Sequence, residues 1–369
     1  MAGKQVDAHV QQDSSPSGRS TVDQPDSDDG LLESLGYRQE FRREFTRWST
    51  LSYAISILGV LGSVPASWGA PLASGGPATA IWTWVSGSFF SLCIALSVAE
   101  LVSALVELPW PVSLRRYFFE TQRALDSHEL EPPGSVMTDY DATAHMSEEL
   151  HNAAISAPAA IVQAIVVSWF FGWLLNIAFG FGAADLDGVL SSPLGNPGAQ
   201  VFMNAGGRAG GLAMWFWVIL VQFFTGISAM LSDTRTCFAL ARDEALPFHS
   251  VWAVVIFCCL LNLIALGSTQ TINGIFGVTA PAMDLSYVAV IATRMYYEKE
   301  HPIEKGPFTL GRWQKPIKIV AIVWVIFISA ILFFPPTYPV TALNMNYAVA
   351  IAAFIALFAL TWWYLEAKK

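Results

Sequence analysis

Eight long apolar runs constrain the fold of this chain more than any other feature of its sequence. Each contains about 17–25 residues, enough for an α-helix rising about 1.5 Å per residue to cross the ~30 Å hydrocarbon core of a bilayer. The runs lie near residues 51–68, 78–102, 160–181, 211–230, 251–267, 272–292, 317–334 and 347–365. Only residues 268–271 separate the fifth run from the sixth, so these two form either separate spans or a tight hairpin. The sequence predicts an all-α polytopic membrane protein with about eight transmembrane helices.

The composition supports this class and excludes others. Hydrophobic residues make up 54% of the chain and charged residues 13%, whereas soluble domains carry about 25% charged residues. The formal net charge of −9 disfavours nucleic acid and other polyanionic partners. No nucleophile elbow, P-loop or dinucleotide fingerprint occurs in the sequence, so we expect neither an enzyme nor a bound cofactor. The four cysteines are Cys93, Cys237, Cys258 and Cys259. We expect them to be buried thiols that form neither a disulfide framework nor a metal site.

Polar segments flank and interrupt the apolar runs. Residues 1–36 are rich in Ser, Asp and Gln and predict a disordered acidic tail, whereas residues 37–369 form the membrane domain. Residues 103–158 form a polar insert between the second and third runs. Counted from a cytosolic N-terminus, 19 of the 20 Lys and Arg residues fall on the inner side, and only Arg208 falls outside. Because cytosolic segments are enriched in Lys and Arg, we expect both termini and the insert in the cytosol.

The first apolar run contains residues that weaken a continuous helix. Gly59, Gly62 and Pro65 lie within it, together with several hydroxyl side chains. A helix break at membrane depth survives where protein or a polar cavity satisfies the freed backbone groups, and secondary transporters use such breaks to hold ions and substrates. The alternative is that the glycines only allow close helix packing.

Two carboxylates are candidates for a coupling or relay role. Asp284 lies near the middle of the sixth run, where a charge is costly and marks a functional or paired position. The alternative is that Pro281 breaks the helix and that Asp284 accepts hydrogen bonds from the loosened N–H groups. Glu100 lies near the inner end of the second run and is expected to face the cytosolic vestibule.

Several strings resemble, in order, those of fungal permeases for amino acids, GABA and choline in the amino acid–polyamine–organocation (APC) superfamily. They cover residues 35–45, 56–59, 95–101, 141–149, 241–247, 306–312 and 344–348. The resemblance implies a twelve-helix bundle in which helices 1–5 and 6–10 form inverted repeats. Substrate binds in that fold where helices 1 and 6 are unwound, flanked by helices 3 and 8.

The resemblance also assigns candidate substrate-binding residues. The break in helix 1 corresponds to Ser56, Ile57, Leu58 and Gly59, and the break in helix 6 to Tyr140, Asp141 and Ala142. Helix 8 corresponds to the run that contains Gln222, Phe223 and Thr225, but no motif indicates which of these faces the substrate.

The chain departs from the family pattern between the second run and Tyr140. Residues 108–117 replace the expected turn, so about four helices (3, 4, 5 and the first half of 6) are expected to be absent. The resulting hypothesis is an incomplete APC-type bundle from a secondary carrier of an amino acid, GABA, choline or a polyamine-like amine. We expect transport to be coupled to protons and the protein to lie in the plasma membrane or the vacuolar membrane. The alternative is a non-transporting fragment that associates with a full-length permease.

Overall fold

The computed structural model describes much of the chain from residue 44 to residue 362. The described residues are 44–105, 143, 146, 149–242, 252, 255, 256, 259, 260, 263, 269–299, 305–335, 339–341 and 345–362. The predicted tail, residues 1–36, and most of the predicted insert lie outside them.

The described residues are helical apart from turns, loops and one isolated β-bridge between Phe45 and Leu150. The helices are α2 (Arg47–Leu58), α3 (Val60–Ser67), α4 (Gly69–Leu105), α7 (Ala153–Gly182), α8 (Leu186–Leu190), α9 (Pro197–Arg242), α11 (Thr269–Tyr297), the 3₁₀ helix η3 (Gly311–Trp313), α12 (Gln314–Leu332) and α13 (Ala348–Trp362). The predicted all-α class is confirmed for this part of the chain.

Five helical segments in the described part are long and apolar enough to span a membrane. They are Arg47–Ser67, Gly69–Ala104, Ala153–Gly182, Pro197–Phe238 and Gly311–Leu332. These segments match the first four predicted runs and the seventh, so the polytopic membrane class is confirmed. The sixth and eighth runs form α11 and α13, and most of the fifth run lies outside the described residues.

The observed helices extend beyond the apolar runs. The third run was predicted to begin near residue 160, but α7 begins at Ala153, and α9 exceeds the predicted 211–230 at both ends. Hydropathy marks only the apolar centre of a helix, whereas the hydrogen-bonded helix propagates into polar flanks. The two longest helices each contain a break in the helical backbone at a glycine. The breaks lie at Gly76 (φ 77°) in α4 and at Gly207 (φ 62°) in α9, where a positive φ carries no Cβ penalty.

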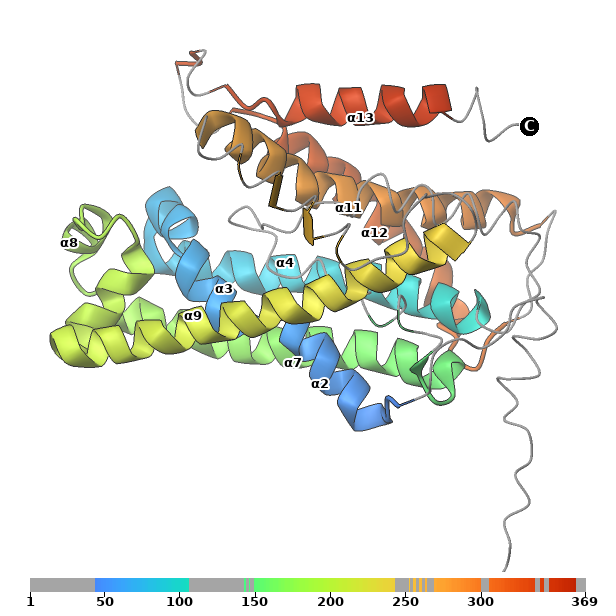
Figure 1. Ribbon diagram of the computed structural model, residues 1–369, viewed down its shortest axis with the longest axis horizontal. Coiled ribbons are helices and arrows are strands. Elements are labelled where there is room, and N and C mark those ends of the chain that lie inside the picture. Colours follow the sequence, from blue (N-terminus) through green and yellow to red (C-terminus); the bar gives the residue numbers. More distant parts are fainter. Residues whose placement is uncertain are drawn as a thin grey trace, which may run out of the picture.

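The helices pack in two groups that share α4. Figure 1 shows α4 and α7 lying side by side along the molecule, with α2, α3 and α9 packed against them, and α11, α12 and α13 on the other side. Small residues allow the close approach of α4 and α7. Gly172 on α7 leaves no room for a Cβ beside the indole ring of Trp84, whose Nε1 donates to the Trp169 carbonyl at 3.0 Å. The main core extends from α2, α3, α4 and α7 to buried residues of α11 and α12, and it includes the fully buried Trp68.

The described cysteines form no disulfide with one another, and they are not all buried. Cys93 is buried, Cys237 is half-buried, and Cys259 is exposed, which corrects the prediction for Cys259. An apolar neighbourhood in sequence does not bury a side chain that faces outward from its helix.

Candidate functional site

The first membrane span is broken at Gly59. α2 ends at Leu58, and Gly59 adopts the left-handed conformation (φ 48°, ψ 30°) before α3 begins at Val60. Both Gly62 and Ser63 donate their backbone N–H groups to the Gly59 carbonyl, at 2.8 and 2.9 Å. The left-handed conformation favours glycine because a Cβ would crowd the following carbonyl. The predicted helix break is therefore present, at the last residue of the predicted Ser56–Gly59 string.

One face of α9 packs against this break and satisfies its polar groups. Thr225 Oγ1 donates to the Ser56 carbonyl at 2.9 Å, and the Ser56 and Ser228 hydroxyls lie 2.9 Å apart. The Ser63 hydroxyl donates to Gln222 Oε1 at 3.5 Å. These three α9 residues are spaced three apart, so they lie on one face of the helix.

The glycines of the first span let α9 approach closely. A Cβ on Gly59 would clash with the Thr225 hydroxyl, and a Cβ on Gly62 would lie 2.6 Å from Gln222 Oε1. The sequence left two alternatives for these glycines, a helix break and close helix packing, and both occur at Gly59. The structure also decides which α9 residues face the break: Gln222 and Thr225 do, whereas the Phe223 side chain points away and is 62% exposed.

The structure places the remaining predicted residues as follows. The side chains of Ile57 and Leu58 are fully buried in the protein interior, so only their backbone groups are available at the break. Tyr140, Asp141 and Ala142 lie outside the described residues. Sequence reasoning missed Ser63 and Ser228, although the three-residue spacing of Gln222, Thr225 and Ser228 was a usable signal.

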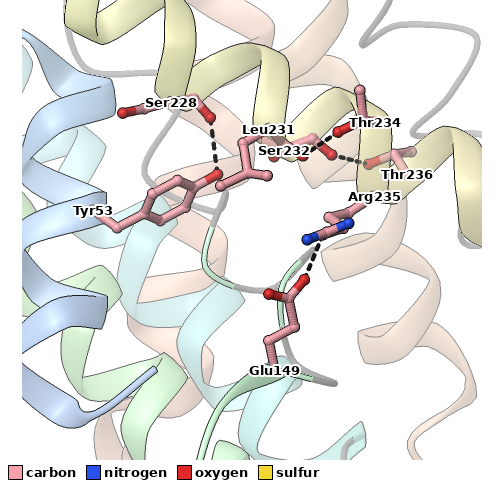
Figure 2. A network of polar contacts seen from close by, with 8 residues as sticks. All are labelled: Tyr53, Glu149, Ser228, Leu231, Ser232, Thr234, Arg235 and Thr236. Carbon is pink, nitrogen blue, oxygen red and sulfur yellow. Dashed lines mark hydrogen bonds and ion pairs between the residues drawn. The ribbon is translucent and has the colours of Figure 1, made fainter. Parts of the chain in front are cut away.

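A second polar cluster lies at the N-terminal end of α2 (Figure 2). Tyr53 on α2 donates its hydroxyl to the Ser228 carbonyl on α9 at 3.0 Å. Further along α9, Arg235 forms an ion pair with the buried carboxylate of Glu149. The backbone of Phe45 pairs with the residues around Leu150, accepting from the His151 N–H at 3.4 Å and donating to the Glu149 carbonyl at 3.2 Å. This cluster joins the start of α2, the segment before α7 and α9.

A buried ion pair links α4 to α12. Glu100 Oε2 lies 2.9 Å from Lys318 Nζ, and Glu100 Oε1 accepts a hydrogen bond from the Leu310 N–H at 3.1 Å. The sequence predicted that Glu100 faces the cytosolic vestibule, and this prediction is wrong because both of its carboxylate oxygens have partners inside the protein. One turn along α4, the buried Ser103 hydroxyl accepts from the Phe308 N–H at 3.0 Å and donates to the Ala154 carbonyl at 2.9 Å. We refer to Glu100, Ser103 and Lys318 as the clamp.

Asp284 lies half-buried on α11, and this helix runs unbroken through Pro281. The alternative in which Pro281 breaks the helix is therefore wrong. The main neighbours of α11 are α12, α13 and α4, whereas those of α2 are α7 and α9. Asp284 and Gly59 thus belong to different packing groups of the molecule.

Comparison with known proteins identifies the family. The profile of the family described as "Amino acid permease" matches residues 132–357. An uncharacterized amino-acid permease of Schizosaccharomyces pombe is 32% identical over an alignment of 481 positions, gaps included, which covers 93% of this chain and 89% of the relative. Amino-acid permease 2 of Neurospora crassa is 27% identical, with 96% and 90% covered. Amino-acid permease BAT1 of Arabidopsis thaliana is 30% identical over 63% of this chain and 49% of its own length. The chain belongs to the amino acid permease family and is a transporter-type membrane protein, not an enzyme.

Proposed function

We propose that the family's transport function resides in this chain at the break between α2 and α3, where an amino acid or a related small amine binds. The observation that carries the proposal is the left-handed Gly59 within the membrane span Arg47–Ser67, with the polar face of α9 packed against it. Broken membrane helices present backbone groups and half-helix ends to substrates and ions. The family match supports amino acids as the class of substrate.

The geometry favours a zwitterion over a cation. The polar contacts at the break come from neutral groups, the hydroxyls of Ser56, Ser63 and Thr225 and the amide of Gln222. The C-terminal end of α2 carries negative partial charge and the N-terminal end of α3 positive partial charge, so the two half-helices suit an ammonium and a carboxylate respectively. An α-amino acid or GABA uses both ends, whereas choline lacks the carboxylate.

We propose proton coupling through Asp284. Both carboxylate oxygens of Glu100 already have partners, Lys318 and the Leu310 N–H, whereas Asp284 is a half-buried carboxylate within the apolar helix α11. Uptake of labelled amino acids, GABA and choline in transport-deficient cells tests this assignment. We expect Asp284→Asn to abolish proton-driven accumulation but to retain exchange of labelled for unlabelled substrate. Glu298→Gln, at the end of the same helix, is the control and should retain both activities.

A second candidate function follows from the length of the chain. The alignment with the S. pombe relative extends over 481 positions, so gaps must lie opposite at least 112 residues of the relative, because this chain has only 369. We propose that the absent residues include helices 3, 4 and 5 and the first half of helix 6, and that they fall between residues 106 and 140, leaving about eight spans. Only 11% of the most apolar 18-residue stretch of α9 is buried inside the protein, which fits a missing neighbouring helix.

Such a chain is either a reduced carrier or a non-transporting fragment that associates with a full-length permease. Uptake above a vector control, with the chain shown to be in the membrane, supports the carrier. Absence of uptake, combined with co-purification with a co-expressed full-length family member, supports the fragment. An impermeant amine reagent added outside intact cells tests the orientation. We expect no labelling of Lys305 if both termini are cytosolic. Organelle fractionation shows whether the chain resides in the plasma membrane or in the vacuolar membrane.

A further inference from the structure

The turn between α11 and α12 carries exposed cations beside exposed aromatic rings. The exposed cations are Lys299, Lys305, Arg312 and Lys315, and we call them the basic turn. The side chain of Trp313 is 57% exposed and that of Tyr296 is 75% exposed. The guanidinium carbon of Arg312 lies 5.6 Å from the centre of the Trp313 ring. Trp and Tyr concentrate where a membrane protein meets the lipid headgroups, so these rings place the turn at that level.

The positive charge of this segment is only partly compensated. Residues 294–318 contain six Lys and Arg residues and three glutamates. Glu298 Oε2 lies 4.0 Å from Lys315 Nζ, and Lys315 is largely exposed, so water weakens this pair. Lys318 is buried and paired with Glu100, so it contributes nothing to the surface. The four cations of the basic turn therefore exceed the three glutamates of the same segment by one formal positive charge.

The clamp holds residues 306–310 of this segment against α4. The Phe308 and Leu310 N–H groups donate to Ser103 and Glu100 on α4, and Gly306 packs so closely on the Ser103 backbone that a Cβ would not fit. Because the backbone of residues 306–310 is already held by these contacts, a ligand bound beside it loses less affinity to the ordering of these residues.

Apolar side chains continue from the basic turn into the membrane. On α12, Ile319 is 51% exposed and Val323 is 62% exposed. They lie one to two helical turns beyond Lys315, so they are about 6–12 Å deeper along the helix axis. The surface thus presents cations at headgroup level and aliphatic side chains at the level of the acyl chains.

We propose that the basic turn binds an anionic phospholipid, with its phosphate held by Arg312, Lys315 and the neighbouring lysines and its acyl chains lying along Ile319 and Val323. Anionic lipids are attracted by clusters of Lys and Arg next to a membrane helix. The inference rests only on the membrane-spanning class of the chain, and it holds whether or not the chain transports a substrate.

The test compares lipid binding by purified protein in detergent. The probes are phosphatidylserine and phosphatidylcholine, and native mass spectrometry counts the lipids retained. We expect selective retention of phosphatidylserine, and at least a tenfold loss of its affinity when Lys299, Lys305, Arg312 and Lys315 are all changed to Gln. The matched control changes Arg38, Arg42, Arg43 and Lys369 to Gln and alters the net charge equally. Monodisperse elution of both variants shows that they remain folded.

Three outcomes would overturn the proposal. Equal loss in the control variant would show attraction by net charge and not by this surface. Equal retention of phosphatidylcholine would show that no anionic headgroup is recognised. Tight binding of water-soluble glycerophosphoserine, without any gain from the acyl chains, would identify a soluble anion as the ligand. A third variant, in which the three lysines become Arg and Arg312 becomes Lys, keeps the charge and should keep binding.

Discussion

Lys318 on α12 and Glu100 on α4 form an ion pair of 2.9 Å in the protein interior. The Lys318 side chain is 2% exposed, so its charge depends on this partner. Removing one member of a buried pair leaves an uncompensated charge, at a cost of about 3–5 kcal/mol, whereas removing both can be nearly neutral. The pair therefore fixes α12 to α4, the helix that the two packing groups share, and single substitutions should reveal its contribution.

We expect Lys318→Met and Glu100→Gln each to lower thermal stability markedly. The double variant should be more stable than the sum of the two single effects predicts, because neither charge is then left alone. Thermal unfolding in detergent, followed by size-exclusion chromatography after heating, measures this double-mutant cycle. Additive effects of the two substitutions would contradict the coupling.

Gly59→Ala should impair both folding and uptake. A residue with a Cβ in the left-handed conformation costs about 1–2 kcal/mol, and this Cβ would also clash with the Thr225 hydroxyl. Gly226→Ala is the matched control, since no atom outside its own helix lies within 4 Å of a Cβ at that position. Comparison of surface expression with uptake per molecule separates the two effects, and equal behaviour of the variants would argue against a required break.

Thr225→Val should reduce substrate affinity more than stability. The change keeps the side-chain volume but removes the hydroxyl that donates to the Ser56 carbonyl at 2.9 Å, leaving that acceptor unpaired at the break. Because this contact is only part-buried, the cost to stability should stay below the ~1–3 kcal/mol of a fully buried unpaired acceptor. Concentration-dependent uptake should show a raised KM, and Thr225→Ser should restore it. Thr361→Val is the control, because the Thr361 hydroxyl bonds only within α13, to the Leu357 carbonyl.

Asn176→Leu should destabilise the fold without a specific effect on transport. Asn176 Oδ1 accepts from Trp68 Nε1 at 3.1 Å, and both side chains are buried. The substitution leaves the indole N–H without its partner, at a cost of about 1–3 kcal/mol. We expect a lower unfolding temperature and less protein in the membrane, with an unchanged KM for the remainder. A raised KM would place Asn176 at the substrate site.

Much of the architecture was predictable from local sequence. Apolar runs locate five of the observed spans because burial in lipid selects length and hydrophobicity, which are properties of a single segment. The glycine, proline and hydroxyl residues of the first span left a helix break and close packing as alternatives, and the resemblance to permeases favoured a break at Ser56–Gly59. The ends of α7 and α9 were not, because hydrogen bonding carries a helix past its apolar centre.

The sequence by itself determined the membrane class, the helical character and the family, and its resemblance to permeases indicated a break within Ser56–Gly59. Tertiary structure alone decided that Glu100 pairs with Lys318, that α9 turns Gln222 and Thr225 toward the break, and that Cys259 faces outward. The physical reason is that hydropathy and glycine conformation act within one segment. Partner choice depends on which faces of distant helices meet; a local pattern such as the spacing of Gln222, Thr225 and Ser228 marks a polar face but does not specify its partner.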